Sequence, residues 1–437
     1  MNLHRVIADR TDGLGARLSA IFNALIISDI VGCDFAFTWP HSYVNNDAFH
    51  TVPEVQDIFS ARFLQTHYFA PQTEREESLP TLTFPMGSLD ETRCVLINLL
   101  STSEHKVSWT PFMRLLKGLS SEDRKSLTFR AVERLGFSTR IETIRRRIQK
   151  QSLPHRARAL HLRSGDIVYG KFADSPGWTT KVIPAPFAAV FLRQDKDPSS
   201  FVIFGQEVDI ADALSKEHGA VNARTLCNPG EISSIEVAFE EIFLLSRCSE
   251  IYSGSSAFAV FAGMLGACTF PKWRRHLSDA QWITLVAAEL EHNHAAYSSK
   301  QVAFSYFYLY ELSHKCGAHF NLLSFIGKAL HFSPTNRLYV LIYCLNSFDQ
   351  SLWDGGEAAL DELGIRLGQS KEELLSSREM RRVLRSRRGG SNPFARHING
   401  LEEAKRAGSP SAGALLKEIL HTEDLGFSRG FQTQLRL

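Results

Sequence analysis

One segment of the chain combines an apolar run with a polar end. Residues 159–168 read ALHLRSGDIV, where His161, Arg163 and Asp166 interrupt apolar side chains. A short apolar run that ends in a polar turn is typical of a buried strand. Ligands of open α/β sheets bind outside the carboxyl ends of the strands, so these three side chains are candidates for a binding site. The alternative is an Arg163–Asp166 ion pair that closes a turn, with His161 in the core.

The first 40 residues alternate in the same way. The pattern predicts a strand at 5–8, a glycine turn TDGLG at 11–15, and a helix with apolar residues at helical spacing from Leu18 to Ile26. Phe35, Phe37 and Trp39 then alternate as in a strand. Such a βαβ unit turns the amides of its helix N-terminus towards the crevice of the sheet. The turn lacks the third glycine of a dinucleotide fingerprint, which argues against an NAD site.

A second alternation of strands and helices begins at residue 159. We expect strands at 201–204, near 221–226 and at 250–252, and helices at 184–192, 209–218, 232–247 and 257–265. A serine-rich turn, SGSS, occupies 253–256. This order predicts an α/β fold with a parallel sheet. Two such domains would face each other across a cleft, with a boundary near Leu153-Pro154.

The remaining segments are less regular. Residues 40–135 alternate Pro-rich, polar and aromatic pieces around a predicted strand at 94–100, and substrate-facing loops are expected there. Residues 139–150 (TRIETIRRRIQK) predict an amphipathic helix whose isoleucines share one face and whose arginines form a solvated face. From about residue 290 the pattern is helical, and residues 303–336 resemble a 34-residue tetratricopeptide (TPR) repeat. A helical cap on the second domain is the alternative.

Composition narrows the class of protein. The 437 residues suffice for two or three domains, and 44% hydrophobic with 22% charged residues is typical of a soluble globular chain. A net charge of +2 gives no case for nucleic acid. Seven scattered cysteines without a CxxC pair favour reduced thiols in the cytoplasm over disulfides or zinc. We expect neither a signal peptide nor an apolar run of transmembrane length. The basic segment 378–390 is interpreted as a solvated link, with peripheral contact to an anionic membrane as the minor alternative.

Three stretches carry a family resemblance: DGLGARL at 12–18, HLRSGD at 161–166 and EEIFLLSRCSEIYSGSSAFAVFAGMLG at 240–266. In this order they resemble the GDP-fucose-dependent fucosyltransferase superfamily, which includes the α1,2-, α1,6- and protein O-fucosyltransferases. The N-terminal stretch looks closest to the bacterial nodulation enzymes. The resemblance implies a GT-B fold of paired Rossmann-type domains, no metal or other cofactor, and inversion at the transferred sugar carbon.

The resemblance also implies roles for individual residues. Arg163 would contact the β-phosphate of GDP-fucose, where charge develops during transfer. Glu241 stands where the family places an aspartate that reads guanine, and His161 would lie near the base and ribose. The other expected donor contacts are Gly13, Gly15, Arg17, Asp166, Ser253, Ser255 and Ser256. Asp12, Asp166 and Asp174 are candidates for the general base, with Asp12 placed in the predicted catalytic set beside Arg163.

Three departures from the family leave the sugar and the acceptor open. Many members have a second arginine at Ser164, an Asn or Asp at Ala16, and an acidic pair after the strand at 201–204, where this chain has Gly205-Gln206-Glu207. We therefore keep two alternatives: a GT-B transferase for another nucleotide sugar, and a catalytically inactive helical-repeat interaction protein.

The expected organisation is an acceptor-side α/β domain at 1–152, a donor domain at 153–290 and a TPR-like extension with a basic tail at 291–437. The expected partners are a nucleotide sugar, a glycan or glycoconjugate acceptor, and a protein bound through the helical repeats.

Overall fold

The computed structural model describes residues 3–40, 52–69, 88–108, 110–112, 119–170, 172–227, 233–317, 321–384 and 394–420. They belong to two compact units. The first comprises Met1–Leu162 and Lys196–Lys272, and the second comprises Arg163–Asp195 and Trp273–Leu437. The domain boundaries expected near residues 152 and 290, and the pairing of two domains across a cleft, stay predictions.

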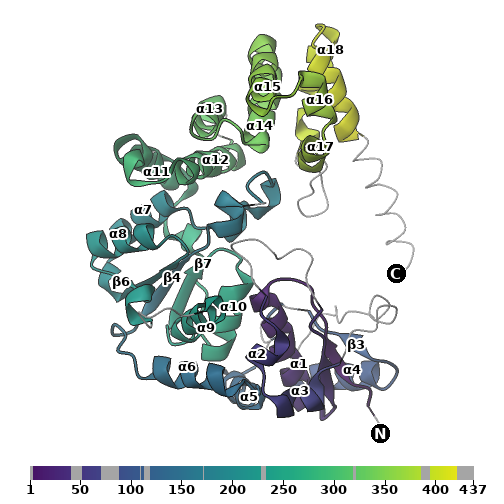
Figure 1. Ribbon diagram of the computed structural model, residues 1–437, viewed down its shortest axis with the longest axis vertical. Coiled ribbons are helices and arrows are strands. Elements are labelled where there is room, and N and C mark those ends of the chain that lie inside the picture. The colour runs from purple at the N-terminus through teal and green to yellow at the C-terminus, as the bar shows by residue number, and fades with distance from the viewer. Residues whose placement is uncertain are drawn as a thin grey trace. The chain divides into compact units, whose positions relative to one another are not determined.

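A three-stranded parallel sheet begins the first unit. Its strands are β1 (Val6–Ala8), β2 (Phe35–Phe37) and β3 (His105–Lys106), in the order β2-β1-β3. The helix α1 (Leu14–Val31) connects β1 to β2 and packs against both (Figure 1). The βαβ unit predicted from the alternation of apolar segments is therefore confirmed.

Helix α1 corrects one expectation about the sequence. It is long and apolar enough to cross a membrane by length and composition, whereas no run of that kind was expected. However, 94% of this segment is buried inside the first unit, against β1, β2 and α5. The helix is apolar all round because it is a core helix, which is the usual reason for such a pattern in a globular protein.

Helices replace one predicted strand in the segment that follows. The helices are α2 (Val55–Ile58), α3 (Ala61–His67), α4 (Leu89–Leu100), α5 (Ser121–Arg134) and α6 (Thr139–Gln149). The strand predicted at 94–100 is wrong, because these residues form the end of α4. Ser88 and Glu91 form a capping box that starts the helix, and Thr92, Leu96 and Leu100 are buried at a spacing of four residues. The apolar run CVLINLL concealed this helical period.

The second sheet of this unit is also parallel, as predicted. It contains β4 (Arg158–Leu162), β5 (Phe201–Gly205), β6 (Val221–Asn222) and β7 (Glu250–Ser253), in the order β6-β5-β4-β7. Helix α8 (Val208–His218) packs against β5 and β6, and α10 (Ala257–Gly266) packs against β7 (Figure 1). Helix α9 (Ser234–Leu245) precedes β7 and packs against α10.

The contact between α6 and α9 corrects one further expectation. The isoleucines of α6 are buried as predicted, but its arginines do not form a purely solvated face. Arg147 pairs with Glu240 of α9, and Arg140 pairs with Glu236 at 3.0 Å. Glu240 of α9 is fully buried. A buried carboxylate needs a charged partner, and Arg147 supplies it.

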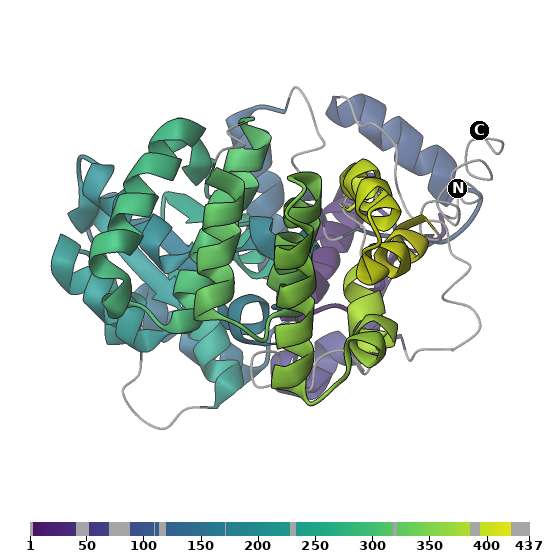
Figure 2. The same ribbon diagram turned by 90° about the horizontal axis from the view of Figure 1, so that it is seen from above.

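The second unit is helical. It holds α7 (Ala185–Gln194), α11 (Asp279–Asn293), α12 (Ser299–Lys315), α13 (Leu322–Phe332), α14 (Arg337–Asp349), α15 (Trp353–Leu367), α16 (Lys371–Ser376), α17 (Arg378–Leu384), α18 (Ile398–Arg406) and a helix at 410–420. Consecutive helices from α11 to α15 pack side by side (Figure 2). The helical extension is confirmed, and its relation to TPR repeats stays a prediction. Residues 385–390 of the basic segment lie outside the described residues.

Candidate functional site at the carboxyl edge of the second sheet

Two neighbouring strands bring two of the sequence motifs to one edge of the second sheet. In the parallel pairing of β4 with β7, His161 stands opposite Ser253. Leu162, the last residue of β4, stands opposite Gly205 of β5. Both strands therefore end at the same edge, where Arg163 follows β4 and the serine-rich turn follows β7. Ligands of open α/β sheets bind at this edge.

Ser256 is the most informative side chain of the serine-rich turn. It precedes the first residue of α10, and its hydroxyl makes no capping hydrogen bond. The residue is fully buried, and Oγ has no hydrogen-bond partner among the described residues. A buried hydroxyl without a partner costs about 1–3 kcal/mol, so the position favours a polar ligand atom as its partner. Ser253 is half-buried and Ser255 is exposed.

Gly15 places a second helix N-terminus against the first. A Cβ on Gly15 would lie 2.4 Å from the main-chain N and Cα of Phe258, in the first turn of α10. Only glycine allows the two helix starts to approach so closely. The first amides of a helix have no partner within the helix, and they favour anions. Gly13, the residue before α1, likewise makes no side-chain cap.

Arg17 holds the glycine turn in shape. Its guanidinium donates to three main-chain carbonyls: Asp12 O at 2.7 Å, Pro40 O at 2.8 Å and Thr11 O at 3.1 Å. The side chain is almost fully buried, 5.0 Å from the ring of Trp39. Burial lowers the pKa of Arg17 to about 10, against the opposing effect of Asp12 and Asp9, so it stays charged at neutral pH. To bind a nucleotide sugar as predicted, the Arg17 guanidinium would have to give up or share one of these three hydrogen bonds.

Asp9, which follows the carboxyl end of β1, is a charged residue that was not among the predicted site residues. Asp9 pairs with Lys106 of β3 at 2.7 Å and accepts a hydrogen bond from Thr38 Oγ1 at 2.6 Å. Asp12, the candidate base, pairs with Arg10 and is 44% exposed. Asp9 could have been predicted as a site residue from the sequence. It directly follows an apolar strand, as the polar residues of HLRSGD do.

Arg163 and Asp166 lie together in the second unit, as the ion-pair alternative requires. Nη2 of Arg163 is 3.3 Å from Oδ2 of Asp166 and 3.5 Å from Oδ1. Asp166 is buried in a π-helical turn, Gly165–Tyr169, while Arg163 is 17% exposed. Both distances are long for a hydrogen bond between charged groups. Ser164 is buried, and its Oγ has no partner in the described part of the chain.

The loop after Arg163 is held by the helical extension of the same unit. Tyr169 Oη lies 2.6 Å from Ser298 Oγ, just before α12, and Asn336 Nδ2, just before α14, donates to Ala173 O at 3.1 Å. Asp174 pairs with Arg337 at 3.8 Å. Burial raises the pKa of Asp174, and Arg337 opposes that rise. Asp174 thus faces the helical extension, a contact that no sequence motif indicated.

The remaining predicted residues lie in the first unit. The ring of His161 stacks on that of Phe258, with centroids 5.9 Å apart. Glu241 of α9 is 17% exposed, and its Oε1 lies 3.8 Å from Nε of Arg224. Burial raises the pKa of Glu241 to about 7, and Arg224 opposes this rise. His161, Ser253, Ser256 and Gly15 are linked through β7 and Phe258, whereas the charged partner of Glu241 is Arg224.

Comparison with known proteins gives similar solved structures only. No protein-family model matches the sequence, and no curated protein matches it. The fucosyltransferase NodZ from Bradyrhizobium is 14% identical, with 61% of this chain and 94% of that chain covered and a TM-score of 0.33. NodZ α-1,6-fucosyltransferase soaked with GDP-fucose is 17% identical, with 60% and 92% covered and a TM-score of 0.33. POFUT1 in complex with GDP-fucose is 11% identical, with 62% and 98% covered and a TM-score of 0.33. At such TM-scores the likeness establishes neither the family nor the activity of this chain.

Proposed function

We propose that this protein is a glycosyltransferase that moves fucose from GDP-fucose to a hydroxyl of a glycan acceptor. The observation that carries the proposal is the buried hydroxyl of Ser256, which has no hydrogen-bond partner among the described residues and lies beside two helix N-termini. The choice of GDP-fucose rests on the three sequence motifs. The nucleotide-sugar site lies, in this proposal, at the carboxyl edge of the second sheet.

The diphosphate is the part of the donor that the residues explain best. The starts of α1 and α10 offer first-turn amides, and Ser256 offers a hydroxyl donor. Arg163, one residue beyond β4, supplies a permanent positive charge and a planar set of donors that match phosphate oxygens. As the bond to the sugar breaks, negative charge grows on the β-phosphate. Groups already aimed at that charge stabilise the transition state more than the ground state.

The base and the acceptor have separate requirements. An ionised Glu241 can accept two hydrogen bonds from N1–H and N2–H of guanine, a pair that adenine does not offer. His161 would then lie near the base and ribose, as the sequence resemblance implies. The acceptor hydroxyl must lose a proton when it attacks the sugar carbon, and Asp12, Asp166 and Asp174 remain the candidate bases. In the absence of a side-chain base, the departing diphosphate takes that proton.

The test measures release of GDP from GDP-fucose by the full-length protein, with and without a panel of neutral glycan acceptors. Ser256→Ala should weaken donor binding without loss of stability, because it removes a hydroxyl that has no hydrogen-bond partner in the described part of the chain. Arg163→Ala should lower turnover by about 10²–10³. Arg163→Lys should restore little of it, because a point charge does not replace the planar fork.

A matched control separates the site from general effects on the core. Ser313 of α12 is also fully buried, and its Oγ has no partner among the described residues, so Ser313→Ala makes the same chemical change elsewhere. It should leave donor binding unchanged. Normal turnover in Arg163→Ala with only a lower Tm would contradict the proposal and leave the ion pair as the role of Arg163. Release of UDP or ADP from the corresponding sugars, but not of GDP, would favour a transferase for another nucleotide sugar.

A further inference from the structure

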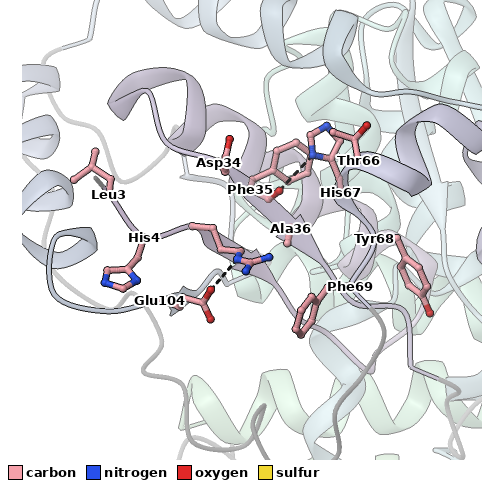
Figure 3. A pocket seen from close by; sticks show the side chains of 11 residues that line it. Leu3, His4, Asp34, Phe35, Ala36, Thr66, His67, Tyr68, Phe69 and Glu104 are labelled. Carbon is pink, nitrogen blue, oxygen red and sulfur yellow. Dashed lines mark hydrogen bonds and ion pairs between the residues drawn. The ribbon is translucent and has the colours of Figure 1, made fainter. Parts of the chain in front are cut away.

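A cavity of about 500 Å³ lies at the amino ends of β1, β2 and β3, within the first unit. Three charged residues that precede these strands line it, namely Arg5, Asp34 and Glu104, and Tyr68 and Phe69 close another side (Figure 3). The glycine turn follows the carboxyl end of β1. The cavity is therefore at the opposite end of the same strand, and its volume falls in the range of small-molecule sites.

The walls of this cavity offer a flat apolar surface beside paired polar groups. Nε of Arg5 lies 2.7 Å from Oε1 of Glu104, and the guanidinium lies 5.4 Å from the centroid of the Phe69 ring. The Nη groups of Arg5 and the hydroxyl of Tyr68 make no hydrogen bond within the described residues. Figure 3 shows Glu104, Phe69 and Tyr68 among the side chains that line the cavity.

The charges of the cavity argue against an anionic ligand. At neutral pH Arg5 is positive, whereas Asp34 and Glu104 are negative. Burial lowers the pKa of His67, and the Phe35 carbonyl 3.3 Å from Nδ1 opposes this change, so the ring is neutral. The charged walls thus carry one more negative than positive group. Phosphates and nucleotides would meet repulsion here, whereas a neutral ligand would not.

We propose that this cavity binds one ring of a neutral saccharide. Each sugar hydroxyl both donates and accepts, so it can use the Nη donors of Arg5 and the carboxylate acceptors of Glu104 and Asp34. The C–H face of a sugar ring carries slight positive charge and packs on the electron-rich face of an aromatic ring, which Phe69 supplies. This inference does not depend on the proposed transfer reaction, because binding at this cavity requires no nucleotide.

Saturation-transfer NMR on the full-length protein tests the inference, with the methyl glycosides of glucose, galactose and N-acetylglucosamine as probes. We expect a transfer signal for at least one of them, with affinity reduced about tenfold in Phe69→Ala. Glu104→Gln keeps the size of the side chain but loses the ion pair, so it should also weaken binding. Phe129→Ala is the matched control, because Phe129 is 62% exposed on α5 and does not line the cavity.

Two results would overturn the inference. The first is the absence of a signal for all three glycosides with the wild-type protein. The second is a signal that Phe69→Ala and Glu104→Gln both leave unchanged, or that GDP displaces, since either would place the sugar elsewhere. If Phe69→Ala fails to fold, Glu104→Gln and the competition with GDP still decide the question. A negative result in this experiment does not contradict the proposed GDP-fucose site. Likewise, a failure to bind GDP does not contradict the saccharide cavity.

Discussion

Gly15 of α1 and Phe258 of α10 are in main-chain contact: a Cβ on Gly15 would lie 2.4 Å from both N and Cα of Phe258. The two residues belong to different sequence motifs, 243 positions apart. Their contact joins the glycine turn to the serine-rich turn within the first unit. The contact explains why the first motif needs a glycine at position 15. It also sets two helix N-termini beside the Ser256 hydroxyl, which lacks a hydrogen-bond partner within the described ranges.

Gly15→Ala should therefore destabilise the first unit. The added methyl group meets main-chain atoms, which cannot rotate away, so the cost should be at least about 1–3 kcal/mol. Thermal unfolding measures it. Gly355→Ala is the control, because a Cβ there meets nothing within 4 Å and the helix α15 should gain from alanine. A Gly15→Ala protein as stable as the wild type would show that the two helices are not in this contact.

Asn336→Asp tests the support of the loop that follows Arg163. The substitution keeps an Oδ atom, which accepts from Tyr339 N at 3.1 Å, but replaces the Nδ2 donor that bonds Ala173 O. An acceptor would then face an acceptor, at a cost of about 1–3 kcal/mol. We expect faster amide hydrogen exchange at 172–175 and lower turnover, with little change in the affinity for GDP. Unchanged exchange at these amides would mean that the loop keeps its structure without the hydrogen bond from Asn336.

Removal of residues 291–437 should give an insoluble protein or one that no longer binds GDP. Residues 163–195 share a compact unit with the helical extension, and Phe307, Tyr310 and Leu341 of that extension are almost fully buried. Truncation would expose the apolar surfaces that α12 and α14 now cover. Size-exclusion chromatography and GDP titration of the truncated protein are the measurements. A soluble truncated protein with wild-type GDP affinity would make the extension a separate acceptor module.

The fold was predictable where apolar segments of strand or helix length alternate with polar or glycine turns. This pattern identified β1, α1 and β2, and all four strands of the second sheet. It failed at α4, because five of the six residues from Val95 to Leu100 are apolar and hide the helical period, and the capping box at Ser88 and Glu91 was the better signal. The helical pattern after residue 290 predicted the helices of the extension. It did not predict that these helices would share a compact unit with the loop after Arg163.

The site was predictable only in part, because motifs report neighbours in sequence. Arg163 with Asp166, and His161 beside the serine-rich turn, follow from strands that end at one edge. The contacts of Asp174 with Arg337 and of Asp9 with Lys106 join distant segments, and nothing in either segment indicates the other. Arg17 illustrates a different limit, because an arginine in a motif can serve main-chain carbonyls as well as a ligand.

Glu241 predicts a pH dependence of GDP binding. The carboxyl group has its pKa raised by burial from 4.5 to about 7, and guanine requires the ionised form. GDP affinity should therefore rise from about pH 6 to about pH 8 and then level off. The stability of the unliganded protein should change with pH in the opposite direction. The raised pKa of Glu241 contributes to the free energy of unfolding below pH 4.5, and this contribution is lost as the pH rises through 7. Glu241→Gln should remove both slopes, and wild-type slopes in this variant would assign them to another group.

Titration calorimetry of the full-length wild-type protein with GDP, UDP and ADP tests the central claim most directly. The three ligands share the diphosphate, so the two helix N-termini, Ser256 and Arg163 should bind all of them to some degree. Only guanine offers the paired donors that Glu241 accepts, so GDP should bind about tenfold or more tightly than UDP and ADP. Equal affinities for the three would contradict guanine recognition, and no binding of any of them would contradict the nucleotide-sugar site itself.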